Sequence, residues 1–371
     1  METAADVNEA DMTGQDATGV DPTDAGYGPV ENIDWGLAAT VGKRVARPGP
    51  RVTRYTWERA NAELVEAAVR SEGPVREVTG LADGLAIPTA QVLDRSGWID
   101  AAARSMPAML GPVQPGEERP GTGFTGKVAG VQAGGLLAFL SSAILGQYDP
   151  FSVDPETGDV GVLMLVTPNI IAVERQLRVD PSDFRLWVCL HEVTHRVQFS
   201  ANPWLADYMR SNVGALTGDD DESVAELVGR ITEGMRSGKP REKGVIGLMQ
   251  LLQSPEQFEA FERVLALGTL LEGHADHVMD AVGPAHVPTV ESIRAAFDRR
   301  RTAPKNPLQR LIRALIGMDA KIAQYVRGKA FVDAVVGQVG MAAFNTVWTD
   351  AATMPRMSEI EDPDAWIARV L

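Results

Sequence analysis

The sequence from residue 186 to residue 199 reads Leu186-Trp-Val-Cys-Leu-His-Glu-Val-Thr-His-Arg-Val-Gln-Phe199. Within it, His191 and His195 are four residues apart, and Glu192 follows the first of them. Residues four apart share one face of an α-helix, so both imidazoles can reach a single metal ion at roughly 2.0–2.1 Å. Glu192 is turned aside from the ion, but it can accept a proton from water that the metal activates. This H-E-x-x-H spacing is typical of zinc sites that perform hydrolysis.

The residues around the motif predict a helix that buries one face. Asp180 is suited to the N-cap and Pro181 to the first helical position. An apolar stripe then recurs at helical spacing, formed by Leu186, Leu190, Val193 and Val197. The chain has five histidines in all, so a chance match to the motif is expected at about the level of a percent. The alternative, two ordinary surface or core histidines, is therefore the weaker interpretation.

A second segment offers the further ligand that a zinc site needs. It reads Leu270-Leu-Glu-Gly-His-Ala-Asp-His-Val-Met-Asp280, on a helix predicted to begin with the capping-box pattern Ser254-Pro-Glu-Gln257. A catalytic zinc ion takes three protein ligands and keeps one position open. Glu272 and Asp276 are four residues apart and share a face. We expect Glu272 to bind the metal and Asp276 to hydrogen-bond a ligating histidine, which would fix its tautomer.

Two histidines compete with Glu272 for the role of third ligand. His274 is the second candidate and His277 the third, and His277 can instead face the substrate as a proton donor or electrophile. The plain alternative makes Glu272 and Asp276 solvated acids on a helix surface. Against it, these charges interrupt an apolar run, where unpaired carboxylates are costly to bury.

Tyr325 is a further candidate for the site. Hydrolases of this chemistry place a tyrosine or histidine where it stabilises the oxyanion of the tetrahedral intermediate. Tyr325 or His277 could stabilise the oxyanion here. Tyr325, however, lies in a predicted helix whose other residues are typical of the hydrophobic core. The competing interpretation is a packed tyrosine whose hydroxyl has a partner.

The two motif segments resemble a known bacterial family of zincin-like proteins, described as zinc-dependent, metallopeptidase-like hydrolases. The resemblance extends over residues 30–371 and includes Leu145-Gly-Gln-Tyr-Asp149, Lys321-Ile-Ala-Gln-Tyr325, Gly328-Lys-Ala-Phe331 and Glu361-Asp-Pro-Asp-Ala-Trp366. It implies a zincin core in which His191, His195 and Glu272 hold Zn²⁺ and Glu192 is the general base. One branch of the family is linked by gene context to the biosynthesis of a deazaflavin cofactor. The family has no established substrate, so the resemblance implies none.

Composition narrows the class of partner. The chain has 371 residues, is 44% hydrophobic and carries a net charge of −15, which disfavours nucleic acid because phosphate binding needs clustered Lys and Arg. The single cysteine, Cys189, excludes an internal disulfide framework. No uninterrupted segment has the length of a membrane-spanning helix, and the N-terminus lacks the pattern of a secretory signal. We therefore expect a cytoplasmic protein without a membrane partner.

The predicted fold is mainly α with a minor β component, a zincin-like metallopeptidase core with a small sheet and an N-terminal helical region. We expect a disordered acidic tail over residues 1–30, the N-terminal helical region over 31–123 and the metal-binding catalytic domain over 124–371. One helix is predicted near 88–95. Residues 160–166 form the best strand, either an edge strand that pairs with a peptide substrate or a plain core strand.

These patterns predict a zinc-dependent hydrolase. The activity that they favour is that of a metallopeptidase. One alternative is an amidase or esterase that acts on a small molecule, which a closed pocket would favour over the long cleft of a peptidase. Another is a non-catalytic zinc protein that serves as a binding or assembly factor. A fourth protein ligand such as His274 would favour that alternative, because it would remove the open position. The sequence carries no signal for an oligomeric state.

Overall fold

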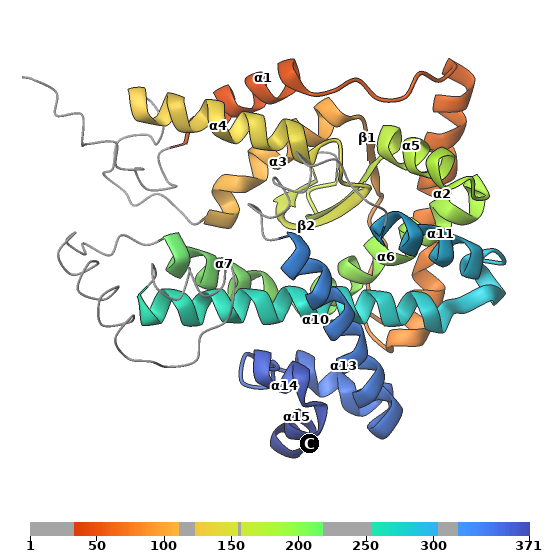
Figure 1. Ribbon diagram of the computed structural model, residues 1–371, viewed down its shortest axis with the longest axis vertical. Coiled ribbons are helices and arrows are strands. Elements are labelled where there is room, and N and C mark those ends of the chain that lie inside the picture. Colours follow the sequence, from red (N-terminus) through yellow and green to blue (C-terminus); the bar gives the residue numbers. More distant parts are fainter. Residues whose placement is uncertain (1–32, 111–122, 155–156, 218–253, 303–317) are drawn as a thin grey trace, which may run out of the picture.

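The computed structural model describes residues 33–110, 123–154, 157–217, 254–302 and 318–371 (Figure 1). This part of the chain is mainly helical and holds one small mixed sheet of three strands, so the predicted fold class is confirmed. The acidic tail expected over residues 1–30 lies outside the described residues.

Helices form most of the described chain. They are α1 (Trp35–Val45), α2 (Arg54–Thr79), α3 (Arg95–Leu110), α4 (Phe124–Leu140), α5 (Thr167–Leu177), α6 (Pro181–Ala201), α7 (Trp204–Thr217), α10 (Pro255–His286), α11 (Val290–Thr302), α13 (Met318–Phe344), α14 (Met357–Glu361) and α15 (Pro363–Val370), with the short 3-10 helix η2 (Asn345–Trp348) after α13.

The sheet has the strand order β1 (Gln91–Leu93), β3 (Val160–Val166), β2 (Gly146–Val153). Strand β3 pairs in parallel with β1 and antiparallel with β2. The strand predicted over residues 160–166 is confirmed, but it is central, so the interpretation of it as a peptide-pairing edge strand is wrong. The helix predicted near 88–95 is also wrong, because residues 91–93 pair with residues 164–166 of β3.

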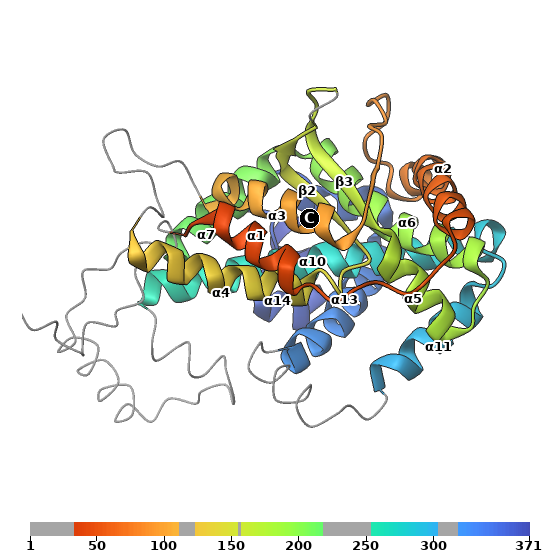
Figure 2. The same cartoon turned by 90° about the horizontal axis from the view of Figure 1, so that it is seen from above.

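Strand β3 buries both of its faces, which joins two layers of helices. Val162, Met164 and Val166 contact a core formed with α1, α3 and α4. Leu163 and Leu165 point the other way, into a core formed with α2 and α6. Figure 1 shows α1 and α4 above the sheet and α6 and α10 below it, and the view from above in Figure 2 shows α1 and α4 side by side. Strand β1 and helix α2 belong to the N-terminal region, residues 31–123. This region is therefore joined to the remainder of the chain by the pairing of β1 with β3 and by the packing of α2 on α6.

Helix α6 begins and packs as its sequence predicts. The Asp180 side chain accepts a hydrogen bond from the backbone N–H of Asp183 at 3.0 Å, and Pro181 occupies the first turn. The whole apolar stripe is buried, namely Leu186, Leu190, Val193 and Val197. Helix α10 begins with the predicted capping box between Ser254 and Gln257. Both helices that carry the motif segments are therefore fixed by local signals at their N-termini.

Buried ion pairs fasten α6 to its neighbours. Arg196 pairs with Glu72 of α2, both nearly inaccessible to solvent, and donates a second hydrogen bond to the Pro88 carbonyl at 2.7 Å. Arg185 pairs with Glu174 of α5 at 2.8 Å. Removing one member of a buried pair leaves an uncompensated charge in the interior, so these contacts restrict where α2 and α5 can lie.

Helix α13 crosses α10 through a contact between two glycines. A Cβ atom on Gly273 would overlap the backbone of Gly328, and one on Gly328 would overlap the Thr269 carbonyl group. Around this crossing lies a third core, in which Phe331 and Val335 of α13 pack with residues of α10, η2 and α15. The backbones can approach this closely only without side chains, and Glu272 is the residue next to the crossing.

Two apolar features concern helices at opposite ends of the fold. By length and composition, residues 327–348 could span a membrane, but Phe331, Val332 and Val335 of that helix are buried against α10.

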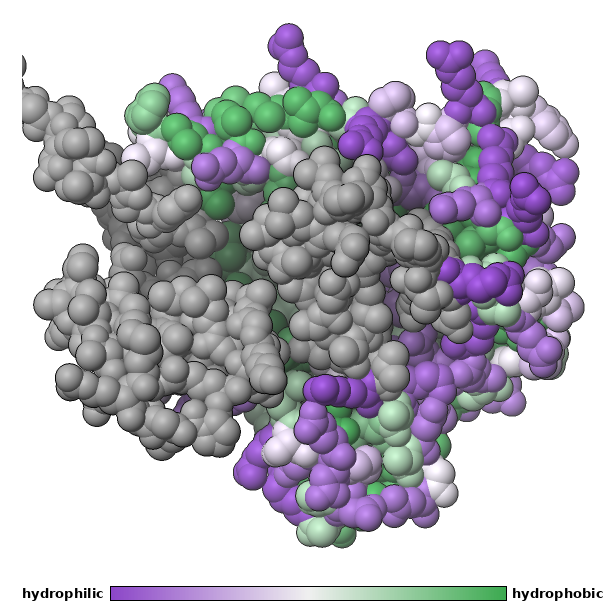
Figure 3. Space-filling model, in the orientation of Figure 1, coloured by the Kyte–Doolittle hydropathy of each residue, from purple (hydrophilic) through white to green (hydrophobic). Residues whose placement is uncertain are grey.

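Helix α4 exposes Phe124 and Leu136, and Figure 3 shows apolar side chains along the top of the molecule where α4 lies.

The glycine crossing generates a stability prediction. Gly273→Ala should lower the free energy of unfolding by about 1–3 kcal/mol, because the added methyl group meets the backbone of α13 rather than a side chain that can rotate away. Urea unfolding followed by far-UV circular dichroism measures the change.

Gly268→Ala is the matched control, since Gly268 lies on the same helix and a Cβ atom there would point into open space. Alanine is the better helix former, so this variant should gain up to about 1 kcal/mol. Equal effects of the two substitutions would contradict the close crossing.

Candidate metal centre

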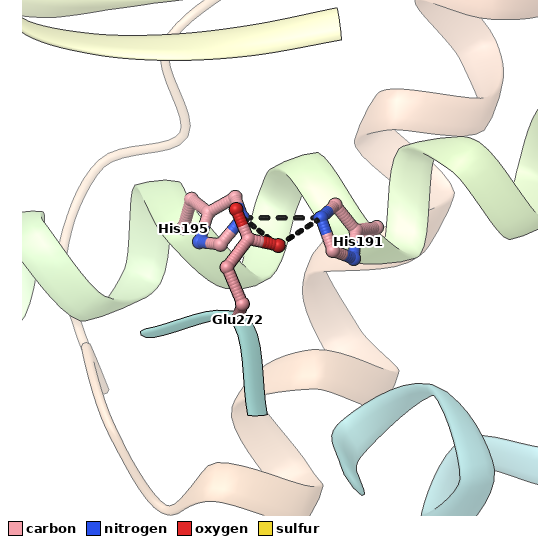
Figure 4. A group of neighbouring side chains, drawn as sticks. All are labelled: His191, His195 and Glu272. Atoms are coloured by element: carbon pink, nitrogen blue, oxygen red, sulfur yellow. Dashed lines mark hydrogen bonds and ion pairs between the residues drawn. The ribbon is translucent and has the colours of Figure 1, made fainter. Parts of the chain in front are cut away.

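Helices α6 and α10 bring three donor groups together (Figure 4). His191 and His195 extend from α6, and their Nε2 atoms are 3.1 Å apart. Glu272 extends from α10, with its Oε2 atom 3.3 Å from Nε2 of His191 and 3.9 Å from Nε2 of His195. One ligand atom from each residue lies within 4.8 Å of the others. The two segments singled out in the sequence thus converge at one point.

The chemistry and spacing of these donors fit zinc. Imidazole nitrogen and carboxylate oxygen are both zinc ligands, and two donors bound to one ion at the tetrahedral angle lie about 3.4 Å apart. The three observed separations, 3.1, 3.3 and 3.9 Å, are close to that value. Among the described residues, this is the group of three or more His, Cys, Asp or Glu side chains placed to hold a metal ion.

Gln198 supports His195 from the side away from the other donors. Its Oε1 atom is 2.9 Å from Nδ1 of His195, and its Nε2 atom donates to the Leu271 carbonyl at 3.0 Å and to Nδ1 of His274 at 2.9 Å. Gln198 is a site residue that sequence reasoning missed. One feature of the sequence could have indicated this role. Gln198 places a polar amide between the apolar residues Val197 and Phe199, three residues after His195.

His274 lies behind Gln198, outside the donor group. It is fully buried, its ring stacks on Phe344 at 5.5 Å between centroids, and Trp348 meets it edge-on at 5.4 Å. Burial lowers the pKa of His274 to about 3, and the charges of His277 and His195 add to this effect. His274 is therefore a neutral imidazole whose Nδ1 atom accepts from Gln198. The geometry brings Glu272, and not His274, to the two histidines of α6.

Glu192 is buried beside the donor group, against the start of strand β2. A Cβ atom on Gly146 would lie 2.7 Å from Cγ of Glu192 and 3.0 Å from its Oε1 atom, so only glycine leaves room for this side chain. Burial raises the pKa of Glu192 to about 7, while the charge of His191 opposes the shift and that of Glu272 adds to it. Gly146 is a second residue that sequence reasoning missed, because the contact joins residues far apart in the chain.

The two histidines of α6 differ in their electrostatics. Burial lowers the pKa of His191, but a hydrogen bond with Glu272 and the charges of Glu272, Glu192 and Asp276 outweigh burial and raise it to about 9. Burial also lowers the pKa of His195, and there it prevails over the charge of Glu272. The carboxylate of Glu272 thus favours the protonated form of the His191 imidazole. Zinc requires neutral imidazole, so its binding displaces that proton.

Asp276 acts on both histidines through its charge, which raises the pKa of each. The hydrogen bond expected from Asp276 to an imidazole is not among those that the described residues form, and Gln198 makes that contact with His195 instead. The backbone carbonyl of Asp276 accepts from Arg294 at 3.2 Å. Asp276 therefore lies near the centre, at a longer range than predicted.

His277 is directed towards α13. Its Nδ1 atom donates to Asp333 at 2.7 Å, and Asp333 also pairs with Lys329. His277 is not part of the donor group. Tyr325 lies on α13, but its side chain is outside the described part of the structure. The roles of His277 and Tyr325 at the oxyanion stay predictions.

A helix with two imidazoles and an adjacent glutamate, completed by a carboxylate from a second helix, defines the zincin class of metal-dependent hydrolases. The chain belongs to the zincin-like metallopeptidase family, whose model matches residues 33–367. The resemblance seen in the sequence is thereby confirmed.

A solved structure shares the fold. It is the crystal structure of a presumed hydrolase with a novel fold from Chloroflexus aurantiacus, 30% identical in sequence, with a TM-score of 0.63. The match covers 91% of this chain and 98% of that one. No curated protein gives a significant match to the chain.

Removal of one donor should abolish tight metal binding. Loss of a residue that only hydrogen-bonds a metal ligand lowers metal affinity by up to about 100-fold. His195→Ala should lower zinc affinity by more than that, because the ion loses a direct ligand. Metal content after dialysis, measured by inductively coupled plasma mass spectrometry, provides the test. His286→Ala is the control, since His286 is exposed at the end of α10. Full zinc stoichiometry in His195→Ala would refute the ligand assignment.

The contact between His191 and Glu272 predicts a titration in the zinc-free protein. The imidazole of His191 should titrate near pH 9, and Glu272→Gln should lower its pKa, because burial remains while the hydrogen bond and the charge of Glu272, the largest influences against burial, are lost. NMR of protein labelled with ¹⁵N at histidine measures both values. Zinc affinity should fall as the pH drops below about 9, where protonation of His191 competes with the metal. An unchanged titration in Glu272→Gln would show that the pair does not form.

Proposed function

We propose that this protein is a zinc-dependent metallopeptidase, with His191, His195 and Glu272 as metal ligands and Glu192 as general base. Membership of the zincin-like metallopeptidase family supports zinc-dependent hydrolysis. The observation that carries the proposal is the convergence of two imidazole nitrogens and one carboxylate oxygen within 4.8 Å, beside a buried glutamate.

The number of donors supports a catalytic centre over a structural one. Structural zinc sites are closed by four protein ligands, whereas catalytic sites have three and keep a position for water or substrate. The expected sign of a closed site was His274 as a fourth ligand. Its Nδ1 atom is instead committed to Gln198, and its ring is enclosed by Phe344 and Trp348. Three donors are thus available in the described part of the chain.

Zinc in such a site supplies activation of water and polarisation of the substrate carbonyl. Glu192 accepts the proton of the attacking water and returns it to the leaving amine. A general base is most effective when its pKa lies near the working pH, and burial brings that of Glu192 to about 7. Gln198 holds the His195 ring, and Asp276 adds negative charge near both histidines.

Strand β2 favours a peptide substrate over a small amide or ester. It is an edge strand of the described sheet, and its first residue, Gly146, lies against the Glu192 side chain. Extended peptides bind sheet edges through backbone hydrogen bonds. A peptide that pairs with β2 would therefore pass close to the general base, which is the alignment that peptide hydrolysis requires.

Substitution of the general base separates metal binding from catalysis. Glu192→Gln should keep zinc at wild-type stoichiometry and lose hydrolysis by about 10²–10⁴-fold, because the amide cannot accept the proton of water. Cleavage of a library of quenched fluorescent peptides, with amide and ester substrates in parallel, measures the activity. Preferred cleavage of the small substrates would favour the amidase or esterase alternative.

Glu259→Gln is the control, because Glu259 is exposed on α10. Undiminished hydrolysis by Glu192→Gln would disprove the assignment of the base. A wild-type protein that binds zinc and cleaves none of the substrates would instead favour the non-catalytic alternative.

A further inference from the structure

The function of the centre depends on which nitrogen of His195 carries a proton. A neutral imidazole has one N–H and one lone pair, and only the lone pair can bind a metal ion. In His195 the Nε2 atom faces His191 and Glu272, while Nδ1 faces Gln198. The proton must therefore be on Nδ1 for Nε2 to serve as a donor.

The Leu271 carbonyl decides the orientation of the Gln198 amide. A carbonyl oxygen can only accept a hydrogen bond, so the atom 3.0 Å from it must be the NH₂ group of Gln198. The amide oxygen then faces Nδ1 of His195 and can only accept, which requires a proton on Nδ1. Leu271 precedes Glu272, so the turn of α10 that provides the carboxylate donor also fixes the tautomer of the second histidine.

His274 takes the second proton of the Gln198 amide. Its Nδ1 atom accepts at 2.9 Å, so its own proton lies on Nε2, a buried atom without a hydrogen-bond partner in the described structure. An unpaired buried N–H costs about 1–3 kcal/mol. An apolar side chain at this position could also contact Phe344 and Trp348 and would avoid that cost. Packing alone therefore does not account for a histidine here, whereas the bond to Gln198 does.

We propose that Gln198 and His274 are positioning residues, which together hold His195 in the tautomer that presents Nε2 to the metal without touching the metal themselves. The role of this pair rests on the proposed metal centre. The aromatic contacts of His274 extend the support to the end of α13 and to η2, which thereby take part in holding a metal-binding side chain.

The tautomer can be tested in the zinc-free protein, independently of catalysis. The chain has five histidines, so ¹⁵N labelling at histidine gives a spectrum that can be assigned by substitution. At pH 8, His195 in the wild type should be protonated on Nδ1 only. In Gln198→Leu a signal from the form protonated on Nε2 should appear, because the acceptor is lost. In His274→Leu a weaker signal of this form should appear, because the Leu271 carbonyl is then the remaining acceptor of the two that orient the Gln198 amide.

Zinc affinity provides the second measurement. Gln198→Leu should lower it by about 10–100-fold, the range for outer partners of ligating histidines, and His274→Leu should also lower it. His274→Asn should recover most of the loss, since the asparagine oxygen can accept the same proton from Gln198. His286→Asn, at the exposed histidine of α10, is the control.

The outcomes separate this inference from the proposed function. Failure of the wild-type protein to bind zinc would refute the metal centre, while the tautomer measurement would still decide the role of the pair. Zinc binding with wild-type affinity by Gln198→Leu and His274→Leu, together with unchanged ¹⁵N signals of His195, would overturn the inference. Equal loss in His274→Leu and His274→Asn would assign His274 to packing and overturn its part.

Discussion

Helix α6 carries charged and polar side chains into the interior of the protein, and several of them bond to groups on other helices. Arg185 requires Glu174, Arg196 requires Glu72, and Gln198 requires the Leu271 carbonyl. Because unpaired polar groups are costly to bury, these demands determine which helices surround α6 and how they face it. The candidate metal centre is the part of this arrangement in which three donors converge on one point.

Local signals in the sequence were sufficient for the two helices that carry the centre. Caps and apolar periodicity depend on residues within a few positions of each other, and they correctly gave the start of α6 at Pro181 and of α10 at Pro255. The H-E-x-x-H spacing likewise places two imidazoles on one face by helical geometry alone. The mainly helical fold class and the strand at residues 160–166 followed from the same kind of evidence.

Contacts between distant segments could not be predicted in this way. The sequence left Glu272, His274 and His277 as competing ligands, because all three lie within two turns of one helix. The choice depends on how α10 is rotated, and the crossing at Gly273 turns one face to α13 while Glu272 faces α6. Strand β1, read as a helix, adopts its conformation through pairing with β3. The supporting role of Gln198 requires the same tertiary packing.

The separation of the donors along the chain has a consequence for folding. His191 and His195 are aligned as soon as α6 forms, whereas Glu272 arrives only when α10 docks against it. Contacts between distant segments form late, because closing a long loop costs entropy before the contact is made. With the ligands proposed above, the growing chain would present two donors first, and the third would complete the site once α10 has docked against α6.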